Sequence, residues 1–122
     1  MFKEPLQNIL EHTDGSIGVL IMGTDGIAVE KVMSPNAVHD RLDEITAAEF
    51  TTLVKSAQRT GGEVNLGRLN ELVFSCEETN IVIRLLSHEY FLVLALGPEG
   101  SLARGRYELR KAELMLASEF TL

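Results

Sequence analysis

The side chains of the sequence that most often serve as nucleophiles, acid–base groups or metal ligands include its one cysteine and its three histidines: Cys76, His12, His39 and His88. Their irregular spacing matches neither a zinc-ligand pattern nor a cysteine–histidine nucleophile pair. We interpret the histidines as surface residues in loops or at helix ends, where such side chains are usually exposed. Cys76 follows the apolar residues 72–74, and we interpret it as a small residue of the core. As the single cysteine of the chain, it excludes an internal disulfide.

Two glycine-containing segments are candidates for a phosphate-binding loop. Residues 60–63 lack the lysine and the hydroxyl residue of such a loop, and residues 97–100 place Glu99 where a phosphate would sit. Turns and a helix end explain both segments better. The adjacent acids Glu77 and Glu78 point to opposite faces of a strand end, which does not suit an acid–base pair. The sequence therefore predicts no catalytic residues, no metal ligands and no cofactor.

The net charge of the chain argues against binding to nucleic acid. With 18 acidic and 11 basic side chains the formal charge is -7, so phosphates would be repelled unless basic residues gathered locally. The densest basic cluster comprises Arg104, Arg106, Arg110 and Lys111. Because Glu108 and Glu113 are interleaved with these residues on a predicted helix, we expect ion pairs within the helix at least as readily as a track for phosphates.

Length and hydropathy predict one soluble domain. A chain of 122 residues has the usual size of a single domain, placed here at residues 1–122, and its 45% hydrophobic content can supply a core. The N-terminus shows no basic region followed by a long apolar segment, and no segment approaches the ~18 consecutive apolar residues of a membrane span. We expect a cytoplasmic protein without membrane insertion.

The elements that must position any functional residues begin with a short helix and a hairpin. Four apolar residues are spaced to share one helical face: Phe2, Leu6, Ile9 and Leu10. Residues 12–15 end this helix, and Gly15 supplies the positive backbone angle that the reversal requires. The apolar segments 17–22 and 27–32 flank Asp25-Gly26, a pair that strongly indicates a tight hairpin turn.

The middle of the chain predicts a helix from Asp43, which can cap it, to Thr60, with Gly61-Gly62 as its stop. One apolar stripe consists of Ala47, Phe50, Val54 and Ala57. Further apolar residues, Ile45 and Leu53 among them, widen this stripe beyond that of a single-sided surface helix. The extra width suggests a second packing partner.

The last third predicts three strands and a helix. A strand at residues 71–76 is followed by two strands within residues 80–97, and Ser101 is the predicted cap of the final helix. Apolar residues run continuously through the two later strands, so both of their faces must be buried. An antiparallel sheet covered by helices on both faces meets this demand.

The order of these elements resembles the Roadblock/dynein light chain family, in its MglB-like bacterial or archaeal form. The local features that carry the resemblance are the Asp25-Gly26 hairpin, the Leu72-Val73-Phe74 strand and the Ser101–Arg104 entry to the last helix. The resemblance implies an α+β fold: a five-stranded antiparallel sheet, one face covered by the middle helix and the other by both terminal helices. The implied order is helix, strand, strand, helix, strand, strand, strand, helix.

The resemblance also implies a homodimer in which the strand after the middle helix, residues 69–77, pairs with its twin at the sheet edge. The middle helices then lie side by side. The expected interface residues are Phe50, Val54, Ala57, Leu72, Val73, Phe74 and Ser75. A free edge offers backbone donors and acceptors that a second copy can satisfy. The alternative is that the wide apolar stripe simply lies deeper in the monomer's own core.

Together these implications predict a noncatalytic homodimeric platform that binds and regulates a small Ras-like GTPase. Activation of GTP hydrolysis is one form of regulation in the family, which does not as a rule donate an arginine finger. Outward residues of the middle helix are the expected GTPase contacts: Glu44, Thr51, Thr52, Lys55 and Arg59. The alternative function is a structural adaptor or scaffold subunit with no GTPase partner.

Overall fold

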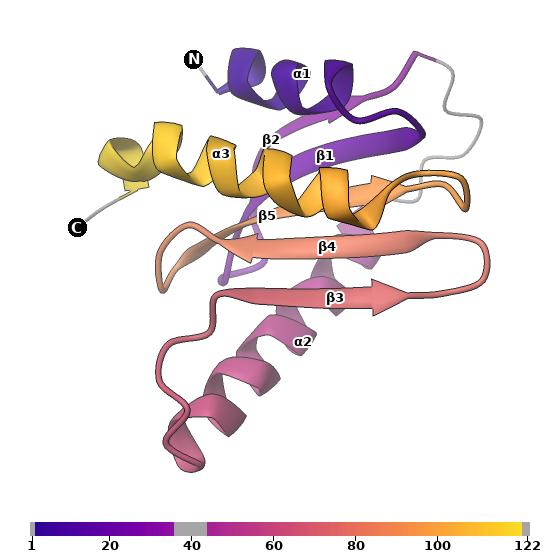
Figure 1. The fold of residues 1–122 in the computed structure, drawn as a ribbon. Helices are drawn as coiled ribbons and strands as arrows, with labels where there is room; N and C mark the ends of the chain where they lie inside the picture. The colour runs from indigo at the N-terminus through magenta and orange to yellow at the C-terminus, as the bar shows by residue number, and fades with distance from the viewer. Residues whose placement is uncertain (1, 36–43, 121–122) are drawn as a thin grey trace.

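The computed structural model describes residues 2–35 and 44–120, and of residues 44–47 it describes the backbone only. The elements follow in the order α1 (Lys3–Glu11), β1 (Ser16–Gly23), β2 (Ala28–Met33), α2 (Glu44–Glu63), β3 (Glu71–Ser75), β4 (Asn80–Leu85), β5 (Tyr90–Leu96) and α3 (Leu102–Phe120). The strands form one antiparallel sheet in the order β2-β1-β5-β4-β3 (Figure 1). The predicted fold class is confirmed.

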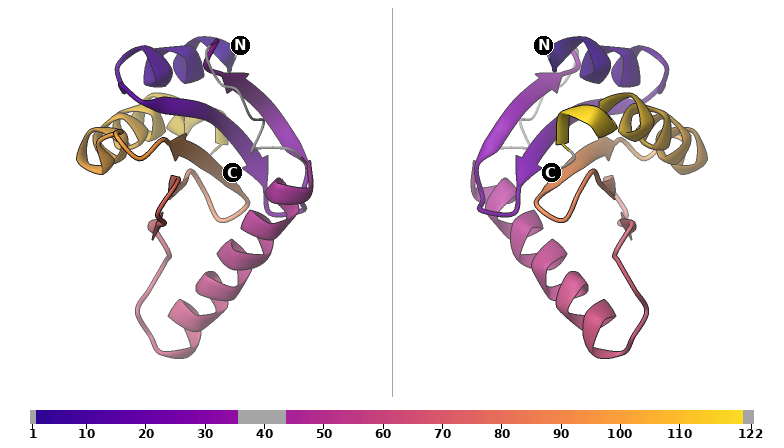
Figure 2. Two further views of the ribbon diagram at one scale, coloured as in Figure 1. Left: turned by 90° about the vertical axis from the view of Figure 1, so that its right-hand side faces the viewer. Right: turned by 90° about the vertical axis from the view of Figure 1, so that its left-hand side faces the viewer.

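Helices cover both faces of the sheet, as the continuous apolar residues of β4 and β5 require. The side views show α1 and α3 on one face and α2 on the other (Figure 2). Successive residues of β5 alternate between these two layers. Leu92, Leu94 and Leu96 pack in the cluster beneath α1 and α3. Phe91, Val93 and Ala95 pack in the cluster beneath α2.

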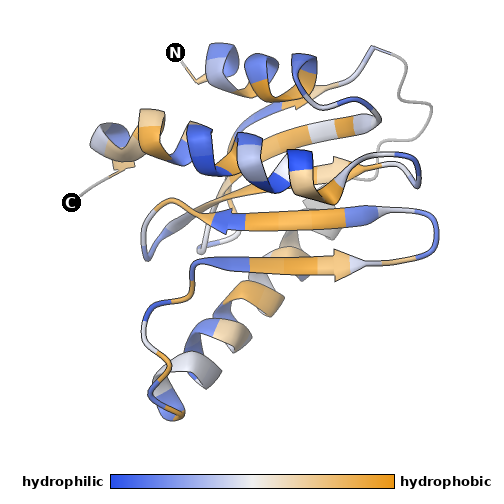
Figure 3. Cartoon of the chain, viewed as in Figure 1, coloured by the Kyte–Doolittle hydropathy of each residue, from blue (hydrophilic) through white to orange (hydrophobic). Residues whose placement is uncertain are grey.

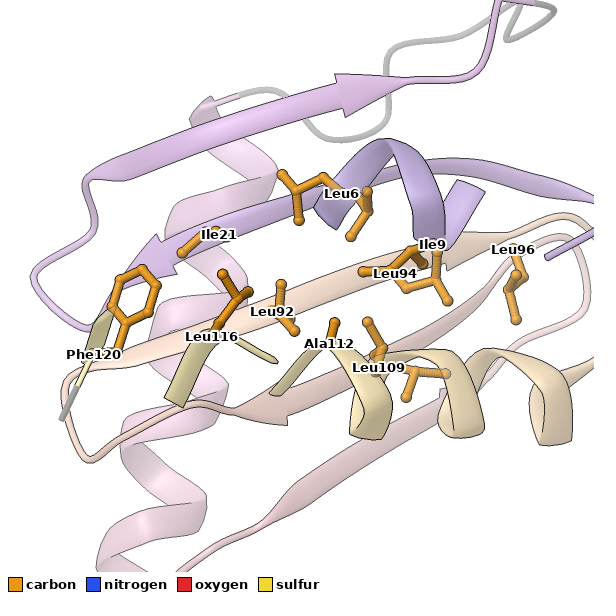
Figure 4. Packing of buried hydrophobic residues seen from close by; sticks show 12 residues of the cluster. Leu6, Ile9, Ile21, Leu92, Leu94, Leu96, Leu109, Ala112, Leu116 and Phe120 are labelled. Carbon is orange, nitrogen blue, oxygen red and sulfur yellow. The ribbon is translucent and has the colours of Figure 1, made fainter. Parts of the chain in front are cut away.

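The cluster beneath α1 and α3 explains the spacing of apolar residues in both helices. Leu6 and Ile9 of α1 and Leu109 of α3 are almost fully buried in this cluster, together with the leucines of β5 (Figure 4). Gly105 allows α3 to approach β5 closely, since a Cβ there would lie 3.0 Å from Cδ2 of Leu94. A larger residue at position 105 would therefore crowd the Leu94 side chain at this contact between α3 and β5.

The predicted turn and cap both form. Gly26 adopts a φ of 89° between β1 and β2, and Oδ1 of Asp25 accepts a hydrogen bond from the Ile27 amide at 3.0 Å. A positive φ favours glycine, which explains the Asp-Gly pair. At the start of α3, Oγ of Ser101 accepts a hydrogen bond from the Arg104 amide at 3.1 Å.

The predicted stop of the middle helix at Gly61-Gly62 is wrong, because α2 continues to Glu63. The chain turns at Asn65, whose φ is 57°. The Leu66 amide donates to the Gly61 carbonyl at 2.8 Å, and the Asn65 amide donates to the Gly62 carbonyl at 3.3 Å. This pair of bonds is a Schellman motif, in which asparagine can replace the usual glycine at the left-handed position.

We predict that Leu94→Ala destabilises the protein by about 3 kcal/mol, because a fully buried leucine leaves a cavity at the centre of the core. The matched variant is Leu114→Ala on α3, where the side chain is 63% exposed, with an expected loss under about 0.5 kcal/mol. Urea denaturation measures both values. Equal losses for the two variants would contradict the described core.

Candidate functional site

β3 forms an edge of the sheet, because β4 is its single partner within the described residues. The Leu85 amide donates to the Asn70 carbonyl at 3.0 Å, and the Cys76 amide donates to the Thr79 carbonyl at 3.3 Å. Backbone direction alternates along an antiparallel strand. Between these two residues, the odd-numbered ones, Glu71, Val73 and Ser75, therefore direct their N–H and C=O groups away from β4.

The centre of β3 is apolar (Figure 3). Leu72 and Phe74 lie half-buried against the cluster beneath α2. Val73 points to the α3 face and is 40% exposed. A strand edge with free backbone groups and apolar side chains is a natural template for pairing with another strand.

The opposite edge, β2, has a different character. Its middle carries Glu30 and Lys31, and its partner β1 has an irregular register between Ile21 and Met22. Charges and irregularities of this kind protect an edge from pairing with another chain. Of the two edges, β3 is the better one for association.

α2 crosses the sheet obliquely, and its C-terminal half extends beyond β3 (Figures 1 and 2). Nε2 of Gln58 donates to the His88 carbonyl at 3.1 Å and so ties the helix to the β4–β5 turn. Between the end of α2 and the segment that returns to β3 lies a cavity of about 470 Å³, lined in part by Ala57 and Leu69. The projecting part of α2 lies on the side into which a second sheet would extend.

The structure corrects part of the predicted dimer interface. Phe50 and Val54 are 8% and 0% exposed and pack on the sheet of their own chain, so they are not accessible to a second copy. For these two residues the alternative expectation, that the stripe lies in the monomer core, describes the packing. Ala57 is half-buried beside the cavity. Residues 72–75 occupy the free edge.

Leu53 is absent from the expected interface residues, although the widened stripe to which it belongs suggests a second packing partner. Its side chain is 42% exposed although it is large and apolar. The available signal was its position: Leu53 lies about 60° outside the arc from Phe50 to Val54 on a helix of 3.6 residues per turn. The structure places Leu53 on the flank of α2, outside the buried part of the stripe.

Three of the predicted GTPase contacts share one outward stripe of α2. Thr52, Lys55 and Arg59 are all exposed, and their spacing of three and four residues places them on neighbouring turns. The outward placement of Thr51 is wrong, because Thr51 is 8% exposed; it lies one residue, about 100°, nearer the sheet than Thr52. The side chain of Glu44 lies outside the described residues.

The described residues with catalytic character lie in three different parts of the fold. Cys76 is exposed, so its prediction as a core residue is wrong: β3 ends at Ser75 and Cys76 already belongs to the following turn. His12 and His88 are exposed at a helix end and in a turn, as predicted, and His39 lies outside the described residues. Within residues 2–35 and 44–120 no three histidine, cysteine or acidic residues are placed to hold a metal ion.

The search for membrane spans gave no candidate among the described helices.

The basic residues of α3 are paired with acids, as predicted, but one of them reaches a strand. Glu108, buried on α3, forms ion pairs with Arg104 at 3.0 Å and with Lys111 at 3.4 Å. Arg106 instead binds Glu71 of β3 with two hydrogen bonds of 2.6 and 3.0 Å. No helical spacing could predict a partner 35 residues away.

A second set of ion pairs joins α3 to β4. The Glu113 carboxylate accepts hydrogen bonds from Arg84 at 2.8 Å and from Arg110 at 2.7 Å. Burial raises the pKa of Glu113, but the bonds from Arg110 and Arg84 outweigh it, and the pKa lies below its ordinary value near 4.5. Since Arg84 also lies 3.6 Å from Glu71, these pairs brace the β3 edge from the α3 side.

We predict a pH-dependent stability difference between the wild type and Glu113→Gln. A lowered pKa stabilises the fold above the ordinary value near 4.5, and this contribution is lost as the pH falls through the folded-state pKa. The wild type should exceed the variant by about 1 kcal/mol at pH 7, and this advantage should shrink as the pH falls below 4.5. Urea titrations over a series of pH values test this. A constant difference would exclude Glu113 ionisation as its source.

Comparison of the chain with known proteins finds similarity to solved structures of one fold. No protein-family model matches the chain, and no curated protein matches it. Among solved structures, an MglB described as having a tetrameric arrangement is 18% identical over 95% of this chain and 85% of its own, with a TM-score of 0.87. A Roadblock/LC7 domain from Streptomyces avermitilis is 12% identical over 98% of this chain and 97% of its own, with a TM-score of 0.83.

A third solved structure, MglC from Myxococcus xanthus, is 28% identical over 98% of both chains, with a TM-score of 0.70. The chain thus has the Roadblock/LC7 fold. Within that class it is similar to MglB and MglC over nearly its whole length. The resemblance predicted from the sequence is confirmed at the level of the fold.

Proposed function

We propose that the protein is a noncatalytic homodimeric platform that binds and regulates a small Ras-like GTPase. The observation that carries this proposal is the free apolar edge of β3 beside the projecting half of α2. The likeness to MglB and MglC supports it. That MglB is itself described as having a tetrameric arrangement, which makes self-association a property of that structural relative.

In the proposed dimer the β3 strands of two copies pair and join two sheets into one. The projecting half of α2 then covers the neighbouring sheet, and Leu72 and Phe74 lose the exposure that they have in a single chain. Pairing of the two edges provides hydrogen-bond partners for the outward N–H and C=O groups of β3. Burial of these apolar side chains further stabilises the dimer through the hydrophobic effect. Leu53 and Ala57 lie on the flank of α2 that meets the second copy.

The proposed GTPase contact is the outward stripe of Thr52, Lys55 and Arg59. Two copies present this stripe twice, on one side of the joined sheet. Regulation requires that the dimer bind one switch conformation of the GTPase more tightly than the other, because only a difference in affinity shifts the population. To reverse the populations of the two switch conformations from about 1:99 to about 99:1, the dimer must bind the favoured conformation about 10⁴-fold more tightly than the other.

We predict that Val73→Pro converts the dimer into a folded monomer. Proline removes the Val73 N–H, which points away from β4 and so serves a second strand but not the chain's own ladder. Light scattering should fall from twice the 13.5 kDa chain mass to that mass. Circular dichroism confirms that the variant is folded.

Lys31→Pro is the matched control at the other edge. The Ser34 amide donates to the Ile17 carbonyl, so by alternation the Lys31 N–H points away from β1; it donates to Oε1 of Glu30. This variant should remain dimeric. A dimeric, folded Val73→Pro protein would contradict pairing through β3.

We predict that the double variant Lys55→Glu, Arg59→Glu binds a small Ras-like GTPase from the same genome at least about tenfold more weakly than the wild type. Reversed charges on the outward stripe repel the surface that the native charges attract. Isothermal titration with the GTPase loaded with GDP or a GTP analogue measures the effect, and Lys3→Glu on α1 is the control on the opposite face.

Nucleotide-dependent binding by the wild type, weakened by the double variant and not by the control, is the expected result. Wild-type binding to neither nucleotide state would contradict the regulator proposal and favour a structural adaptor. Equal binding of the GTPase by all three proteins would show that Lys55 and Arg59 of α2 do not form the GTPase contact.

A further inference from the structure

We propose that two copies join about a two-fold axis at Val73, so that Leu72 of each copy lies opposite Phe74 of the other. This inference rests on the proposed homodimer and adds what the dimer alone leaves open: which residues face one another across the β3 edge. The register decides which surfaces of the two copies are brought together.

Backbone direction limits the possible registers. Glu71, Val73 and Ser75 direct their N–H and C=O groups outward, whereas the residues between them are turned to β4. Outward residues of one copy must meet outward residues of the other in order to exchange hydrogen bonds. In an antiparallel pair this condition places the two-fold axis at a residue and excludes an axis between two residues.

The axis at Val73 pairs every residue of β3. Glu71 then lies opposite Ser75 of the second copy, and each Val73 lies opposite the other on the α3 face. On the α2 face, Leu72 and Phe74 form two apolar cross-strand pairs, one on each side of the axis. Both side chains are half-buried in the single chain and have apolar surface left to cover. Apolar and aromatic cross-strand pairs stabilise a sheet.

The neighbouring registers are worse for identifiable reasons. An axis at Phe74 places Glu71 opposite Glu77 twice, and an axis at Glu71 places Glu71 opposite itself. Like charges directly opposite one another destabilise a ladder. An axis at Leu72 places Phe74 opposite the polar Asn70 and leaves Ser75 outside the strand pair.

The ion pairs of Glu71 fit an uncharged neighbour across the axis. Its carboxylate already accepts two hydrogen bonds from Arg106 and lies 3.6 Å from Arg84, all within one chain. It therefore requires no cation from the second copy. Ser75, the residue opposite it in the proposed register, supplies a small side chain with no charge.

The single cysteine of the chain provides the test. In the proposed register Cys76 lies opposite Asn70 of the second copy. Both residues are turned to β4, so across the axis they form a non-hydrogen-bonded pair with Cα atoms about 4.5 Å apart, within disulfide reach. Within one chain, six residues of strand separate them by about 20 Å, which excludes an intramolecular bond.

Mild oxidation of Asn70→Cys should give a covalent dimer on a non-reducing gel, at least about tenfold more than Leu72→Cys gives. Leu72→Cys reports the register with its axis at Phe74, in which residue 72 faces Cys76. The double variant Asn70→Cys, Cys76→Ser should lose the cross-link, which identifies the bond. Light scattering of each reduced protein measures the non-covalent dimer separately.

A cross-link from Leu72→Cys and none from Asn70→Cys would overturn the register but leave the dimer intact. A cross-link that survives Cys76→Ser would also overturn it, because residue 70 would then face itself. A reduced dimer that neither variant cross-links would also overturn the register at Val73, because Cys76 would then face neither residue 70 nor residue 72 of the second copy. Reduced proteins that are all monomeric, the wild type included, would instead overturn the proposed homodimer.

Discussion

The structure depends on one constraint: β5 is apolar on every residue from Phe91 to Leu96, and all of these residues are buried. A strand of this kind must lie inside the sheet and must have a helical layer on each side. α1 and α3 together supply one layer, and α2 alone supplies the other. The two faces are therefore covered unequally.

The unequal cover leads to the candidate interface. A single oblique helix packs over the middle of its face and leaves Leu72 and Phe74 at the β3 edge half-exposed, while its own C-terminal half projects past the sheet (Figure 2). Contacts within the chain cover both features only in part. Both are completed when a second sheet continues from β3, whereas the charges of Glu30 and Lys31 oppose the same event at β2.

Much of the fold could be predicted because its signals are local. Asp25-Gly26, Ser101 and the uninterrupted apolar strands each determine structure within a few residues. The site was harder to predict, because it depends on how α2 is rotated on the sheet. Thr51 and Leu53 each lie near the boundary between the buried and exposed sides, where an error of one residue exchanges core for surface.

Other errors arose from interactions that no local pattern records. Asn65 ends α2 in place of the two glycines, since an asparagine in a Schellman motif is less distinctive than Gly-Gly. Arg106 binds Glu71 across 35 residues of sequence. Cys76 is exposed because the strand ends one residue earlier than its apolar pattern suggested.

The central claim is that the outward backbone groups of β3 are paired with a second copy in solution. Residue-resolved amide hydrogen exchange by NMR tests it most directly. The account predicts that the Glu71, Val73 and Ser75 amides exchange slowly, like the interior amides of β4, and that their protection falls on dilution to the monomer. Rapid exchange of these three amides at all protein concentrations, beside protected Leu72 and Phe74 amides, would contradict it.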